Sequence, residues 1–128
     1  MPMCAQQLSS KAVLVVDDDA DIRSTVRDIL EDEGYRVTDA ANGFEALRQL
    51  REGSAPNLIL LDLSMPVMSG SEFRFEQRKD PSLASIPVVV VSAVGSLDMK
   101  VAPLEAAAFL RKPVQLDELL GVVERYCS

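Results

Sequence analysis

Short apolar runs alternate along the chain with longer segments in which apolar residues recur every three or four positions. The runs are strand-sized, and most consist almost wholly of apolar residues, which predicts strands buried on both faces. They span residues 12–16, 35–40, 58–61, 86–91 and 107–110. A sheet made of such strands needs helices on both of its faces.

The periodic segments predict helices. They span residues 21–33, 72–78 and 117–126, and a further helix that begins after Asn42 closes at Gly53–Pro56. The stretch from Ser96 to Leu104 is a weaker candidate, because its Pro103 fits only near the end of a helix. We therefore expect a short or poorly ordered helix in that stretch. Five strands alternating with five helices predict an α/β fold with a parallel sheet.

The chain has 128 residues, of which 48% are hydrophobic and 26% are charged. This size and composition predict a single globular domain with one core. We expect residues 1–10 to form a flexible tail and residues 11–128 to form the domain. The Met start and the complete last helix favour a chain that was not cut from a larger protein.

The formal net charge of −7 disfavours binding to nucleic acid or to anionic membranes, which both need basic surfaces. The apolar runs are also far shorter than the roughly 20 residues that span a bilayer. Cys4 and Cys127 form no CxxC motif, which fits reduced thiols in the cytoplasm, although a bridge between them stays open. We expect a cytoplasmic protein with no membrane and no nucleic-acid partner.

The chain contains no histidine. This excludes Ser-His-Asp and Cys-His catalysis and every metal site that uses an imidazole. Any chemistry must come from carboxylates, lysines, hydroxyls or thiols. Such groups follow the predicted strands: Asp17 and Asp18, Asp62, Ser92 and Lys112. Ligands of an open parallel sheet bind outside the carboxyl ends of its strands, so we expect these residues to form the site.

Clustered carboxylates repel one another unless a cation neutralises them. Oxygen ligands without imidazole or thiolate favour Mg²⁺ over Zn²⁺. A metal, a hydroxyl and an ammonium group together suit phosphoryl transfer, and a carboxylate can itself accept the phosphoryl group.

Four segments carry a family resemblance: Val13–Asp19, Leu60–Pro66 with Gly70 after it, Val90–Ala93 and Phe109–Pro113. In order and approximate spacing they resemble the receiver domains of bacterial two-component response regulators. The resemblance implies a doubly wound (βα)5 fold of flavodoxin type, with five parallel strands in the order 2-1-3-4-5. It also implies a stand-alone switch of the chemotaxis or phosphorelay type, since the chain has no room for an effector domain.

The resemblance implies a role for each matching residue. Asp62 would accept the phosphoryl group from a phosphohistidine of a histidine kinase or a phosphotransfer protein. Mg²⁺ would be held by Asp17, Asp18, Asp62 and the backbone carbonyl of Ser64. The protein would not be an enzyme beyond assisting its own phosphorylation and slow dephosphorylation.

The family's remaining contacts fall on later segments of the chain. The Ser92 hydroxyl, the Lys112 ammonium and the Ala93 amide would contact the phosphoryl oxygens. Ser92 and Phe109 would couple phosphorylation to a switch. A downstream protein would then bind the face made by residues 96–104, the fifth strand and the last helix. The segment between Ser92 and Lys112 departs from the family pattern, so this output face is less well defined than the acceptor site.

Two other functions stay open at this point. Asp17 and Asp19 form a DxD motif after a strand, as in phosphatases of the haloacid dehalogenase type. The chain is short for such an enzyme, and Asp19 runs directly into a helix, where it is better read as structural. The second alternative is a receiver-like scaffold that works without phosphorylation.

Overall fold

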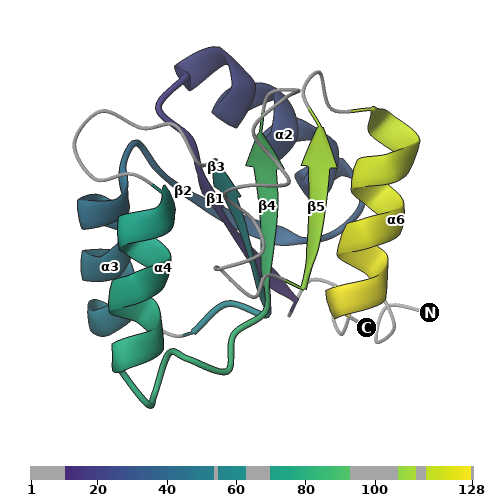
Figure 1. Cartoon of the computed structure of the whole chain (residues 1–128). Helices are drawn as coiled ribbons and strands as arrows, with labels where there is room; N and C mark the ends of the chain where they lie inside the picture. Colours follow the sequence, from purple (N-terminus) through teal and green to yellow (C-terminus); the bar gives the residue numbers. More distant parts are fainter. Residues whose placement is uncertain (1–10, 54, 63–69, 93–106, 112–114, 128) are drawn as a thin grey trace.

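The chain folds into alternating strands and helices (Figure 1). The computed structural model describes residues 11–53, 55–62, 70–92, 107–111 and 115–127. The elements are β1 (Ala12–Val16), α2 (Ala20–Asp32), β2 (Arg36–Ala40), α3 (Gly43–Glu52), β3 (Leu58–Asp62), α4 (Gly70–Lys79), β4 (Val88–Ser92), β5 (Ala108–Arg111) and α6 (Leu116–Cys127).

All five strands form one parallel sheet in the order β2-β1-β3-β4-β5. This confirms the predicted fold class and strand order. Val16 of β1 pairs with Leu61 of β3, and Asp62 pairs with Val91 of β4. The last residues of the three central strands therefore lie at the same edge of the sheet.

Helices cover both faces of the sheet: α3 and α4 lie on one side, and α2 and α6 on the other (Figure 1). Successive residues of a strand point to opposite faces. Leu14 and Val16 accordingly pack with Leu47 of α3 and Phe73 of α4. The other face has its own buried cluster. It contains Val13 and Val15 of β1, Val26 and Leu30 of α2, and Leu119 and Val123 of α6.

The start of α2 is set by its cap. The Asp19 carboxylate accepts hydrogen bonds from the amides of Asp21 and Ile22, at 2.9 and 3.2 Å. The helix therefore begins at Ala20, one residue before the predicted start. Gly34, at a φ of 97°, turns the chain after the helix, as expected of a glycine in that position.

The start of β4 differs from the prediction. The strand begins at Val88 and not at Ile86. The Ile86 amide donates to the Leu83 carbonyl inside a turn, and the Ile86 carbonyl accepts from the Gln77 side chain of α4. These bonds hold Ile86 in the turn, a tertiary effect that its β-branched side chain does not reveal.

Two predictions on organisation concern residues outside the described ranges. They are the flexible tail at residues 1–10 and the weak helix at residues 96–104. Within the described ranges, no helix is both long and apolar enough to cross a membrane.

Candidate functional site

Three aspartates converge at the carboxyl ends of β1 and β3. Each of Asp17, Asp18 and Asp62 has a carboxylate oxygen within 4.8 Å of those of the other two. Asp17 and Asp62 are only 3% and 4% exposed, whereas Asp18 is open to solvent. The sheet explains this meeting, because β1 and β3 are neighbours in register and end at the same edge. The sequence pattern predicted this convergence, and the structure brings the three side chains together.

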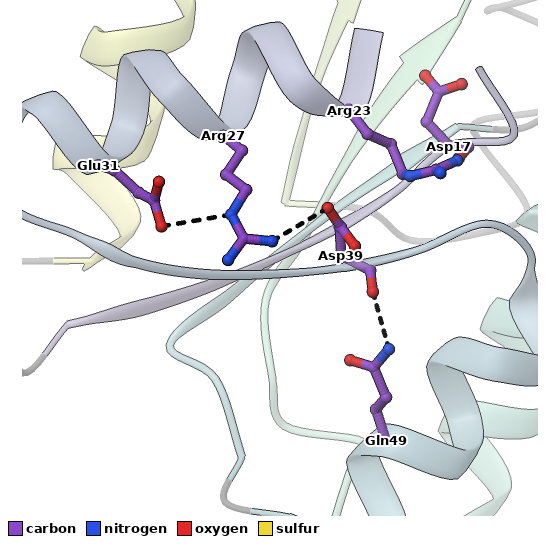
Figure 2. Close-up of polar contacts among 6 residues, drawn as sticks. All are labelled: Asp17, Arg23, Arg27, Glu31, Asp39 and Gln49. Carbon is purple, nitrogen blue, oxygen red and sulfur yellow. Dashed lines mark hydrogen bonds and ion pairs between the residues drawn. The ribbon is translucent and has the colours of Figure 1, made fainter. Parts of the chain in front are cut away.

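Asp17 is held on three sides. Its amide donates to the Ala40 carbonyl of β2 at 3.1 Å, and one of its carboxylate oxygens accepts from the Asp19 amide at 2.9 Å. Its carbonyl accepts from the Arg23 guanidinium of α2 at 2.7 Å. Figure 2 shows Arg23 reaching from the helix toward Asp17. The contact from Arg23 was not anticipated from the sequence, where the only signal is a basic residue in the first turn of the helix after the aspartates.

Asp19 lies outside the three-aspartate cluster. The oxygen that caps α2 accepts two backbone amides, so this side chain has a structural role, as predicted. The cluster that could hold a metal ion therefore contains Asp17 and Asp18 rather than a DxD pair of Asp17 and Asp19.

The remaining predicted site residues are described only in part. The backbone of Ser92 ends β4, and Phe109 lies within β5. The side chains of both, and all of Ser64, Ala93 and Lys112, lie outside the described residues. The roles expected of these five residues remain predictions.

A small cavity of about 20 Å³ adjoins the two buried carboxylates. Apart from Asp17 and Asp62 its lining is apolar. The apolar side chains are Val15, Val16, Ile22, Val26, Leu60, Val91 and Leu119. Charges against such a surface interact more strongly than charges in water, because the surroundings are poorly polarisable.

The cluster fits a hard divalent cation. Carboxylates held within 4.8 Å of one another repel, and water screens this repulsion less where Asp17 and Asp62 are buried. A cation between them would replace repulsion with attraction. The three candidate ligands offer only carboxylate oxygens, the donor type that Mg²⁺ prefers.

Comparison with known proteins identifies the family. A family model described as response regulator receiver domain matches residues 13–124, nearly the whole chain. The chain belongs to the receiver domain family. This confirms the resemblance seen in the sequence motifs.

Curated relatives of this receiver domain include short and long proteins. An uncharacterized 14.6 kDa protein of Leptolyngbya boryana is 39% identical over 95% of this chain and 94% of its own length. Sporulation initiation phosphotransferase F of Bacillus subtilis is 33% identical over 93% of this chain and 95% of its own length. The transcriptional regulatory protein PrrA of Mycobacterium leprae is 41% identical, but the receiver domain spans only 50% of it.

Solved structures agree on the fold. Chemotaxis protein CheY4 of Vibrio cholerae superposes with a TM-score of 0.81 at 31% identity, over 91% of this chain and 98% of that one. The signal receiver domain of a histidine kinase from Syntrophus aciditrophicus superposes with a TM-score of 0.85 at 28% identity, over 91% and 89%. Receiver domains thus occur in chemotaxis proteins and within kinases, so the fold alone does not specify a pathway.

Proposed function

We propose that this receiver domain is a phosphorylation switch in which Asp62 accepts a phosphoryl group with the help of Mg²⁺. The observation that carries the proposal is the cluster of Asp17, Asp18 and Asp62, in which two like charges are buried side by side. If these positions served stability alone, apolar residues in place of the aspartates would make the fold more stable.

In the proposed reaction a carboxylate oxygen of Asp62 forms a new O–P bond. The N–P bond of a donor phosphohistidine breaks, and the imidazole that leaves takes up a proton. The donor histidine must lie outside residues 1–128, because these residues include no histidine. When bound, Mg²⁺ would neutralise the carboxylates and the incoming phosphoryl oxygens.

The chain's own residues hold this arrangement. Asp17 and Asp18 are positioned to share the cation with Asp62, and the backbone contacts of Asp17 keep its carboxylate in place. By family resemblance the carbonyl of Ser64 would complete the metal ligands. Also by resemblance, the phosphoryl oxygens would contact the Ser92 hydroxyl, the Ala93 amide and the Lys112 ammonium, and Phe109 would take part in the switch.

The partners belong to the same proposal. The donor would be a histidine kinase or a histidine phosphotransfer protein in the cytoplasm. The similarity to sporulation initiation phosphotransferase F supports a place in a chain of phosphoryl transfers. The output would be a protein that binds the face of residues 96–104, β5 and α6. We propose no enzymatic activity beyond self-phosphorylation and slow loss of the phosphoryl group.

The test is phosphorylation by acetyl phosphate with Mg²⁺, followed by intact mass spectrometry. We expect the protein to gain one phosphoryl group, and Asp62→Asn to gain none. Asp19→Asn is the matched control, because asparagine caps a helix as well as aspartate does and the residue lies outside the cluster. It should be phosphorylated like the original protein.

Three results would contradict the proposal. Phosphorylation of Asp62→Asn at the level of the original protein would show that another residue accepts the phosphoryl group. Phosphorylation of Asp17 would favour the haloacid dehalogenase mechanism. A protein that is never phosphorylated, even by kinases of its own source organism, would be the phosphorylation-independent scaffold.

A further inference from the structure

Arg23 joins the start of α2 to the end of β1. Its Nη1 donates to the carbonyl of Asp17 at 2.7 Å, and its amide donates to the carbonyl of Asp19 at 3.0 Å. The side chain is half-buried and lies beside the aspartate in Figure 2. Arg23 therefore binds both ends of the short loop that carries Asp18.

The Asp17 carbonyl belongs to the peptide bond between Asp17 and Asp18. Fixing that carbonyl restricts the rotation of the whole peptide plane, because the peptide bond is planar. The plane determines the direction in which the Asp18 side chain leaves the backbone. Asp18 is the exposed member of the cluster, so contacts with a packed core do not hold it as they hold Asp17 and Asp62.

We propose that Arg23 is a positioning residue of the cation site. Its hydrogen bond holds the peptide between Asp17 and Asp18 so that both carboxylates meet Asp62. The inference rests on the proposed function, since it assumes that the cluster binds Mg²⁺. Residues that orient metal ligands in this indirect way change metal affinity by about 10–100-fold when they are replaced.

The charge of Arg23 acts in the opposite direction. A guanidinium close to the cluster repels Mg²⁺, so removal of the charge alone would tighten binding. Removal of the hydrogen bond would weaken binding, because the ligands would lose their alignment. Weaker Mg²⁺ binding after replacement of Arg23 therefore indicates a positioning role, and tighter binding indicates that only its charge acts on the site.

Calorimetric titration with Mg²⁺ tests the inference on three variants of the full chain. Arg23→Met keeps the apolar stem but has no donor and no charge, and Arg23→Lys keeps the charge and a donor group. Arg27→Met is the control, because Arg27 lies one turn further along α2 and contacts Glu31 and Asp39. Urea unfolding without Mg²⁺ shows whether each variant is folded.

We expect Arg23→Met to raise the dissociation constant for Mg²⁺ by about tenfold, the lower end of the range for such residues. Arg23→Lys should raise the constant less than Arg23→Met does, because its ammonium group can still donate to the Asp17 carbonyl, and Arg27→Met should not change the constant. Arg23→Ala replaces the methionine variant, with the same expectation, if that variant does not fold.

An unchanged or lower dissociation constant in Arg23→Met overturns the positioning role, and so does an equal loss in Arg27→Met. Absence of Mg²⁺ binding by the original protein overturns the proposed function and this inference with it. The two failures are distinct, because the first is seen only in the variants and the second in the unmodified chain.

Discussion

Among the described residues, buried polar side chains lie in two places, and these places differ in the charges that they bring together. At the ends of β1 and β3, Asp17 and Asp62 bring like charges together. Inside α4, Arg74 and Gln77 are 8% and 0% exposed and bond to each other, with the Arg74 guanidinium donating to the Gln77 side-chain oxygen at 2.8 Å.

Gln77 also ties α4 to the turn that precedes β4. Its amide nitrogen donates to the carbonyls of Leu83 and Ile86, at 2.9 and 3.1 Å. Donor and acceptor are thus complementary at every contact that this side chain makes. The network has a structural role, because each bond holds a piece of backbone in place.

The contrast gives a physical criterion for function within this fold. Buried polar groups with complementary partners stabilise the architecture. Like charges held close together in a poorly polarisable environment cost stability, and they are retained where a ligand will neutralise them. The comparison therefore predicts that variants of the Gln77 network lose stability but still respond to Mg²⁺. Variants of the aspartate cluster should instead lose the stabilisation by Mg²⁺.

Gln77→Leu should have the largest effect on stability. Leucine has a similar size but no donor, so the carbonyls of Leu83 and Ile86 and the Arg74 guanidinium lose a buried partner. We expect the free energy of unfolding to fall by about 2–4 kcal/mol, measured by urea unfolding. Lys79→Leu, at an exposed position on the same helix where the ion pair with Glu76 is open to solvent, should change it by less than about 1 kcal/mol. Equal effects at the two positions would remove the distinction that the comparison draws.

Mg²⁺ should act on the aspartate cluster alone. At a concentration about 100 times its dissociation constant, Mg²⁺ is expected to raise the free energy of unfolding of the original protein by about 2.7 kcal/mol. In Asp17→Asn most of this increment should disappear, although asparagine can still accept the bond from the Asp19 amide. Gln77→Leu should retain the increment in full. Urea unfolding curves with and without Mg²⁺ measure this increment for each variant. Loss of the increment in Gln77→Leu would show that the Gln77 network and the aspartate cluster are coupled.

Replacement of Asp80, which lies directly after α4, should have the smallest effect on the free energy of unfolding. The size of that effect should depend on pH. The hydroxyl of Ser82, and then its amide, donate to the Asp80 carboxylate and lower its pKa below the usual value. The contribution of this carboxylate to stability is therefore present above the ordinary aspartate pKa and is lost as the pH falls through the lowered native pKa. We expect Asp80→Asn to be less stable than the original protein near neutral pH and equal to it in strong acid. A difference that persists unchanged in acid would show that the charge of Asp80 is not the cause.

Much of the architecture could be predicted because it follows from local patterns. The continuous apolar runs predicted buried parallel strands, and the spacing of apolar residues predicted α2 to within one residue at each end. The start of β4 at Val88 has a local signal that the apolar pattern alone does not contain, because Pro87 has no amide N–H for the strand ladder. It also has a tertiary cause, since Gln77 of another element donates to the Ile86 carbonyl.

The amino-acid sequence by itself determined the alternation of strands and helices and the position of Asp17, Asp18 and Asp62 after their strands. Parallel strands end at one edge, so even the meeting of these aspartates was implicit in the pattern. Only the tertiary structure decided that Asp17 and Asp62 are buried while Asp18 is exposed, and that Arg23 holds the Asp17 carbonyl. Burial and hydrogen bonding between elements depend on how α2 and α6 pack against the sheet, and that packing is a property of the whole chain rather than of any one segment.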